Sequence, residues 1–232
     1  MLRRLSFPPR LALALLCIAA LAQSAETPVP VRDEPNHRVT FENDYLRMIE
    51  VHIPAGVTTL YHLHTIPSVV IRMSRTTIVS QEWGAAPPAP SPTAPGETRY
   101  APYDEKPLTH RVTNRGPGVF QVLDIELLRP LASIDPTPPT PPPDFKLEWE
   151  QNRVRLYQLP LAAGKQTGIA ANGCAHLLVS VSGAVQTSAG ANATGTNREL
   201  KAGGYLYFAP HRRLQIGNRG TAAASCLLLE LR

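Results

Sequence analysis

The chain carries one sequence pattern twice, and this internal repeat limits the fold more than any other feature. The segment Phe41-Glu-Asn-Asp-Tyr-Leu-Arg47 matches Trp149-Glu-Gln-Asn-Arg-Val-Arg155, and further on Asn114-Arg-Gly116 matches Asn218-Arg-Gly220. A repeat of this kind indicates one structural unit that is used twice. Each copy has roughly 90 to 100 residues, which is enough for a modest core of its own. We therefore expect two similar domains in tandem.

The apolar residues of both copies fall in short runs rich in Val, Ile and Leu, which are typical of β-strands. No segment after the first two dozen residues shows a convincing helical period. Many short strands separated by Gly and Pro turns favour a sandwich or a barrel, so the predicted fold class is all-β. The runs are residues 46–53, 68–73, 120–128, 177–181 and 226–231.

A proline-rich run, Asp135–Asp144, separates the two copies. Proline-rich chain favours an extended polyproline conformation over a helix or a central strand, so we interpret the run as a stiff linker. We therefore predict a first domain over residues 36–130, a linker over 131–145 and a second domain over 146–232.

The first 22 residues have the pattern of a secretory signal peptide. A basic head, Met1–Arg10, precedes an apolar run over 11–21 that is far shorter than the roughly 20 residues needed to span a bilayer. Small residues follow, and we expect cleavage near Ala22 or Ala25. The mature protein would then have no stable membrane span and would be periplasmic or secreted, whereas an uncleaved membrane anchor is the alternative.

Cleavage would lower the formal net charge from +5 to +2, because Arg3, Arg4 and Arg10 are removed with the signal. The remaining chain has no cluster of Lys and Arg and no stripe of interleaved aromatic residues, which nucleic-acid-binding proteins usually show. We therefore expect no nucleic-acid partner.

Two cysteines, Cys174 and Cys226, remain after the signal is removed, in a compartment that permits disulfides. A disulfide requires Cα atoms within roughly 7 Å of each other, and the sequence does not fix that separation. Two interpretations are therefore open: Cys174 and Cys226 form a disulfide, or they are two small buried thiols.

Three histidines form the motif that carries chemistry. The first copy has Gly56, then His62 and His64 after five intervening residues, and later His110 followed by Asn114. This arrangement resembles the two motifs of the cupin family, G(x5)HxH(x3,4)E(x6)G and H(x3)N, and the resemblance covers essentially the whole mature chain. Alternate residues of a strand share a face, so His62 and His64 can both point into the interior of a barrel.

The resemblance implies two small jelly-roll β-barrels and, in the first, one divalent transition metal ion held by His62, His64 and His110. Fe, Mn, Zn, Ni and Cu are the ions implied, and neutral imidazoles suit them. The chain departs from the family at two positions, because Ser68 replaces the glutamate ligand and Arg75 the later glycine. A serine hydroxyl is a poor ligand beside a carboxylate, so three histidines and water are expected to hold the ion.

Two more side chains are candidates for the pocket of the first barrel. Alternation along residues 68–72 places Ser68, Val70 and Arg72 on one face of a strand. If that face is the inner one, Arg72 offers a fixed positive charge suited to a carboxylate. The alternative is an arginine at the surface or at a sheet edge.

The second copy lacks the histidines of the motif. The repeat aligns Ala170, Asn172 and Leu214 with the three histidines in turn. We therefore expect a second cupin barrel that has lost the metal ligands.

Two functions are compatible with this pattern. One is an exported bicupin that uses a divalent metal ion to act on a small-molecule substrate, in the manner of cupin dioxygenases, decarboxylases or isomerases. The other is a non-catalytic bicupin without metal, which binds a small ligand or has a structural role. Cupins often dimerise, so a homodimer is one expectation, and packing of the two barrels against each other within one chain is the other.

Overall fold

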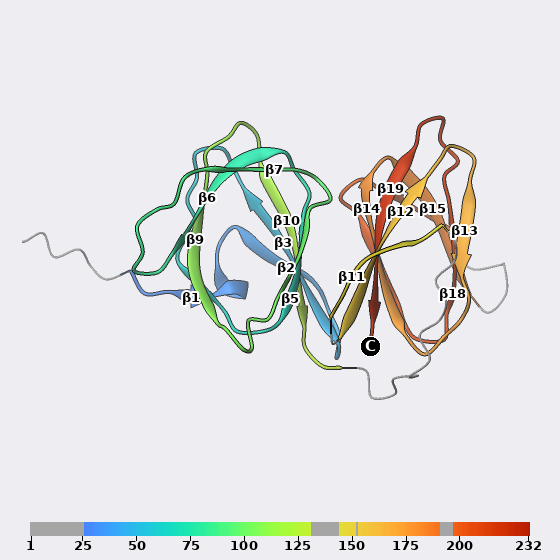
Figure 1. Cartoon of the computed structure of the whole chain (residues 1–232), viewed down its shortest axis with the longest axis horizontal. Coiled ribbons are helices and arrows are strands. Elements are labelled where there is room, and N and C mark those ends of the chain that lie inside the picture. Colours follow the sequence, from blue (N-terminus) through green and yellow to red (C-terminus); the bar gives the residue numbers. More distant parts are fainter. Residues whose placement is uncertain (1–25, 131–143, 152, 191–196) are drawn as a thin grey trace, which may run out of the picture.

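The computed structural model describes residues 26–130, 144–151, 153–190 and 197–232, and Figure 1 shows two β-barrels in tandem. Each barrel consists of two sheets, so the predicted all-β class is confirmed. The predicted signal peptide, residues 1–22, and residues 131–143 of the predicted linker lie outside the described residues. Within the described ranges, no helix has the length and apolar character needed to cross a membrane.

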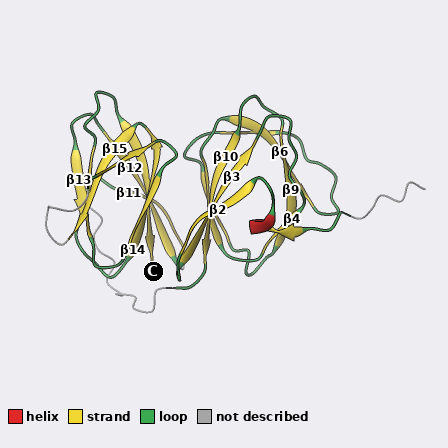
Figure 2. Ribbon diagram, turned by 180° about the vertical axis from the view of Figure 1, so that it is seen from behind, coloured by secondary structure: helices red, strands yellow, loops and turns green. Residues whose placement is uncertain are grey.

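The first barrel is built from two five-stranded sheets. In spatial order, the first sheet consists of β1 (Val29–Pro30), β4 (His62–His64), β9 (Leu108–Asn114), β6 (Thr76–Glu82) and β7 (Ser91–Thr93). The second consists of β2 (His37–Glu42), β3 (Leu46–Ile53), β10 (Phe120–Leu127), β5 (Ser68–Arg72) and β8 (Thr98–Ala101). A short 3-10 helix, η1 (Val31–Asp33), follows β1 and is the red segment in Figure 2. The barrel therefore includes β1 and η1, which precede residue 36.

The second barrel repeats this strand order. One sheet consists of β11 (Lys146–Gln151), β12 (Val154–Leu161), β19 (Ala224–Leu231), β14 (Ala175–Ser182) and β17 (Tyr205–Phe208). The other consists of β13 (Gln166–Ile169), β18 (Arg213–Gly217), β15 (Ala184–Gly190) and β16 (Arg198–Lys201). Among the described strands, β13 has no neighbour that corresponds to β1 of the first barrel.

The two barrels share one apolar core, which lies between the β2-β3-β10-β5-β8 sheet and the β11-β12-β19-β14-β17 sheet. In β10, Leu123 and Ile125 belong to this shared core, whereas Val122 and Asp124 line the interior of the first barrel. Strands that are buried on both faces have nearly continuous apolar sequences. The predicted runs over 120–128 and 226–231 correspond to β10 and β19, which occupy this position in the two barrels.

The sequence repeat preserves an ion cluster in each barrel. In the first barrel, Arg47 donates hydrogen bonds to the half-exposed Glu42 and to the buried Glu126, at 2.7 and 2.5 Å. The equivalent trio in the second barrel consists of Arg155, Glu150 and Glu230. A buried arginine needs such partners, because an unpaired charge in the interior is costly.

Cys174 and Cys226 are both buried in the second barrel. Cys226 is a free thiol, so the Cys174–Cys226 bridge left open by the sequence does not form. Burial raises the pKa of the Cys226 thiol to about 11, and Cys226 belongs to the apolar core of this barrel. It therefore acts as a small buried hydrophobe.

Candidate metal centre

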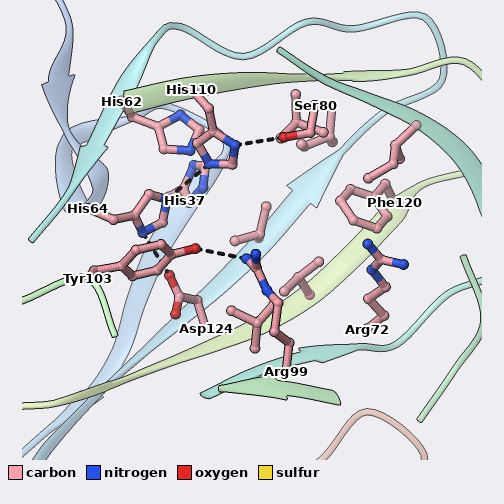
Figure 3. A pocket seen from close by; sticks show the side chains of 16 residues that line it. His37, His62, His64, Arg72, Ser80, Arg99, Tyr103, His110, Phe120 and Asp124 are labelled. Carbon is pink, nitrogen blue, oxygen red and sulfur yellow. Dashed lines mark hydrogen bonds and ion pairs between the residues drawn. The ribbon is translucent and has the colours of Figure 1, made fainter. Parts of the chain in front are cut away.

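The three predicted ligands meet at one point inside the first barrel (Figure 3). His62 on β4 is paired directly with His110 on the antiparallel β9, and His64 lies two residues further along β4 on the same face. All three side chains are buried. Their candidate ligand nitrogens all lie within 4.8 Å of one another, and the Nε2 atoms of His64 and His110 are 3.1 Å apart.

The Nδ1 atoms of these histidines are turned away from that point. His62 Nδ1 donates to the Leu60 carbonyl at 3.0 Å, which fixes the tautomer because a carbonyl can only accept. His110 Nδ1 lies 2.8 Å from the Ser80 hydroxyl. His64 Nδ1 faces Asp124 Oδ2 at 3.5 Å. Metal-binding histidines commonly use their second nitrogen in this way, which orients the first toward the ion.

The three imidazoles are neutral at neutral pH, which is the form that binds metal ions. Burial, reinforced by neighbouring imidazoles, lowers the pKa of His62 to about 4, of His64 to about 2 and of His110 to about 3. An ion would therefore displace no proton from these groups at pH 7.

The donor set fits a transition metal ion. Two nitrogens bound to one such ion at about 2.1 Å can lie at most about 4.2 Å apart. The observed separations, from 3.1 Å to no more than 4.8 Å, require only small inward movements. Imidazole donors suit Zn, Cu, Fe and Ni.

The carboxyl group nearest to the cluster comes from β10, and sequence reasoning missed it. Asp124 is 3% exposed and faces His64. Burial, with a smaller effect from Glu126, raises the pKa of Asp124 to about 7. The signal available in the sequence was a single aspartate inside the apolar run over 120–128.

The two predicted pocket residues lie in different environments. Ser68 is fully buried, donates a hydrogen bond to the Ile66 carbonyl at 3.1 Å and is not among the residues that line the cavity. Arg72 does line the cavity, and its guanidinium pairs with Glu97 at 2.7 Å. In Figure 3, Arg72 lies at the end of the cavity away from the histidines.

The cavity beside the cluster has a volume of about 210 Å³ and a largely apolar wall. A second arginine, Arg99 on β8, reaches into it between Arg72 and the histidines. Arg99 donates to the Tyr103 hydroxyl at 2.8 Å, and the Tyr103 ring lies 4.7 Å from the His64 ring. No sequence signal connected either residue with the histidines. The apolar wall includes Val51, Ile53, Val70, Ile78, Val112, Phe120 and Val122.

The second barrel has apolar side chains where the first has histidines. Leu214, fully buried, occupies the position of His110 as the repeat predicts, but its partner across the strands is Ile169 and not Ala170. In the first barrel, Thr58 pairs with Thr113 and His62 with His110, so the segment from Thr58 to His62 is one residue longer than the segment opposite it. This extra residue shifts the register of the first barrel by one position relative to the second. Apolar side chains, among them Ile169 and Leu214, fill the interior of the second barrel.

No protein-family model matches the chain, and no curated protein matches it in sequence. Solved structures, however, share its fold. AerE from Microcystis aeruginosa has a TM-score of 0.61 and 11% identity, over 88% of this chain and 98% of that one. Salicylate 1,2-dioxygenase from Pseudaminobacter salicylatoxidans has a TM-score of 0.58 and 12% identity, over 81% and 71%.

A third similar structure is the formate complex of oxalate decarboxylase from Lactobacillus farciminis, with a TM-score of 0.55 and 9% identity over 84% of this chain and 80% of that one. The salicylate dioxygenase has also been solved as an adduct with gentisate, at a TM-score of 0.58 and 11% identity over 81% and 68%. Identities this low establish a common fold only.

Proposed function

From the premise that this chain has the tandem cupin fold, we propose that it is an exported metalloprotein that transforms a small organic acid at a divalent metal ion. His62, His64 and His110 hold the ion in the first barrel. The second barrel has a structural role. This proposal takes the enzymatic alternative over the metal-free binding protein.

The observation that carries the proposal is the arrangement of the three imidazoles. They are buried and neutral, their ligand nitrogens converge, and each Nδ1 faces another group of the barrel. A remnant of a lost site would have no reason to keep all three properties. A bound ion would supply Lewis-acid or oxygen-activating chemistry at the edge of the cavity.

The charges in the cavity favour a carboxylate as the substrate group. Glu97 pairs with Arg72, whereas Arg99 forms no ion pair among the described residues and Tyr103 accepts its hydrogen bond. Its acidic neighbour in the cavity, Asp124, interacts with it electrostatically and has a raised pKa. A guanidinium on an apolar wall is well suited to bind a carboxylate in a bidentate way. The similar structures are named for salicylate and oxalate, and two of them contain gentisate and formate, which are all carboxylic acids or their anions.

The size of the cavity sets a limit on the substrate. An apolar cavity of about 150 Å³ in another protein binds benzene. The cavity of about 210 Å³ next to the histidines therefore accommodates a molecule with one small ring and one carboxylate. We propose that Arg99 and Tyr103 orient this acid while the apolar wall excludes water.

Export is a separate part of the proposal and rests on the amino-terminal sequence alone. Expression of the full chain in a bacterium, followed by mass determination of the periplasmic product, tests it. We expect a chain shortened by about 22 to 25 residues. A full-length chain recovered from the cytoplasm would contradict export without bearing on the metal site.

Thermal unfolding with candidate ligands tests the proposed substrate class, because a ligand that binds the folded state raises the Tm. We expect salicylate, gentisate or oxalate to raise the Tm of the metal-loaded protein, and uncharged amide analogues to have little effect. Arg99→Gln should remove the response, and Arg115→Gln, an exposed arginine outside the cavity, should retain it. Equal stabilisation of the metal-free protein would favour the non-catalytic binding protein.

A further inference from the structure

A fourth imidazole lies beside the three candidate ligands. His37 is the first residue of β2, lines the same cavity, and has a side chain that is only 4% exposed. Its ring centroid is 4.7 Å from that of His62, and the centroids within the cluster of three are 4.5 to 5.1 Å apart. Figure 3 shows His37 next to His62, His64 and His110 at one end of the cavity.

Glu34 fixes the orientation and the tautomer of His37. Its carboxylate lies 2.5 Å from His37 Nδ1 and also accepts hydrogen bonds from the backbone and side-chain nitrogens of Asn36 and from the Leu60 backbone. Despite burial, which raises it, these hydrogen bonds lower the pKa of Glu34 to about 2. A carboxylate oxygen accepts the hydrogen bond from Nδ1–H, so Nε2 is the nitrogen of His37 that could bind an ion.

The remaining nitrogen of His37 is available for a ligand. No described residue forms a hydrogen bond with His37 Nε2. His37 lies outside the group of three whose ligand nitrogens are all within 4.8 Å of one another, so binding an ion there would draw its ring inward. A histidine held by a carboxylate through its other nitrogen is nevertheless typical of metal ligands.

The segment that carries this pair occurs only in the first barrel among the described strands. β1 pairs in parallel with β4, with Val29 opposite His62, and the buried Val31 anchors η1 in the apolar core. Glu34 and His37 follow directly. In its described part, the second barrel has neither a strand equivalent to β1 nor histidines at the three ligand positions.

We propose that His37 is a fourth protein ligand of the metal ion and that Glu34 is its positioning residue. This inference rests on the proposed metal site and adds a donor from an element outside the two histidine motifs. It gives the site a fourth protein donor, although the chain has Ser68 in place of the usual glutamate.

The first test uses the wild-type mature chain loaded with zinc. Long-range ¹H–¹⁵N spectra of the labelled protein report which histidine nitrogens bind the ion. We expect four imidazoles with zinc-bound nitrogens, one of which is lost in His37→Gln. Three bound imidazoles with an unperturbed His37 would overturn the inference and leave the proposed metal site intact, whereas a failure to bind any zinc would overturn the proposed function first.

The second test measures zinc affinity by competition with a chromophoric chelator. Glu34→Gln should weaken binding by roughly 10- to 100-fold, the usual effect of losing a partner of a ligand histidine. His37→Gln should weaken it at least as much and also change the visible spectrum of bound Co(II). His52→Gln, an exposed histidine on β3, is the matched control and should change neither. Wild-type affinity and an unchanged spectrum in folded His37→Gln would contradict the assignment.

Discussion

The histidines of the first barrel are held in one protonation state by their surroundings. Burial favours the neutral form of His62, His64 and His110, and their Nδ1 contacts leave Nε2 directed at the common centre. The same burial favours the protonated form of Asp124, whose pKa is raised to about 7. In the metal-free site, the three histidines and Asp124 therefore have opposite effects on the pH dependence of stability.

We predict that the metal-free protein loses stability on acidification from about pH 7.5 to about pH 5. The unfolded histidines take up protons near pH 6.5. The folded ones do so only at about 4, 2 and 3, so their contribution is complete above pH 6.5 and is lost as the pH falls. Asp124 has the opposite effect on stability. Its raised pKa means that the folded state takes up a proton below about pH 7, before the unfolded state does, so this group stabilises the folded state as the pH falls.

Each group changes the free energy of unfolding by about 1.4 kcal/mol per pH unit between its folded and unfolded pKa values. The loss from three histidines is therefore larger than the gain from one carboxyl group. Urea unfolding of chelator-treated protein at the two pH values measures the difference. Asp124→Asn, which lacks the opposing titration, should lose more stability than wild type. Equal or greater stability of the wild type at pH 5 would be inconsistent with buried neutral histidines.

The sequence predicted the three histidines because they lie in short motifs, but not the side chains that complete the site. His37 precedes the first repeated segment, and Arg99 and Asp124 lie on β8 and β10 without any motif around them. These residues approach the histidines only through sheet pairing. A pattern read along the chain contains no information on such contacts unless strand partners are known.

At the scale of strands and turns, the repeated Asn-Arg-Gly segments have a structural role. The Asn114 side chain donates to the carbonyls of Ile53 and Gly118, both at 2.9 Å, and accepts from the Gly116 backbone. Asn218 makes the equivalent hydrogen bonds in the second barrel. The asparagine of the H(x3)N motif therefore fixes the turn between β9 and β10, and it is retained where the histidine is not.

We predict that Asn114→Ala lowers the free energy of unfolding by roughly 1–3 kcal/mol, because buried carbonyl groups lose their donor. Asn218→Ala should have an effect of similar size. Asn197→Ala, at an exposed position, should change it by less than about 0.5 kcal/mol. Denaturant unfolding of the three variants measures these changes, and a neutral Asn114→Ala would refute the structural role of this side chain.

The repeat predicted the strands well but not their register. Residues 46–53, 120–128 and 226–231 are strands within two residues of the predicted bounds, because burial on both faces makes them rich in apolar residues. Alignment by sequence placed Ala170 at the position of His62, whereas Ile169 occupies that position in the second barrel. A one-residue shift changes the face to which every side chain points, and sequence similarity alone does not detect it.

At the scale of the whole molecule, the two barrels stabilise each other through their shared core. Side chains of both barrels bury one another there, and the Trp149 indole of the second barrel also donates to Thr98 of the first at 3.0 Å. Because unfolding of either barrel would expose this shared apolar core, we expect the two barrels to unfold in one cooperative transition. The second barrel, with its filled interior, therefore supports the first one, which contains the cavity.

We predict that Leu229→Ala, in the second barrel's part of the shared core, destabilises both barrels together by about 2–5 kcal/mol. Trp83, in the first barrel, reports on its unfolding when Trp149 is replaced by Phe. Trp83 fluorescence and circular dichroism should show one coincident transition, shifted to lower temperature. Two separate transitions, with that of Trp83 unshifted, would show that the barrels unfold independently.

The presence of a metal ion in the first barrel is the central claim, and metal analysis of the purified mature chain tests it most directly. After incubation with a divalent transition metal and removal of the excess, we expect about one ion per chain. His110→Ala should retain almost none, and the exposed-site control His52→Gln should match wild type. A folded wild-type protein that takes up no metal, or a His110→Ala variant that binds as much as wild type, would contradict the claim.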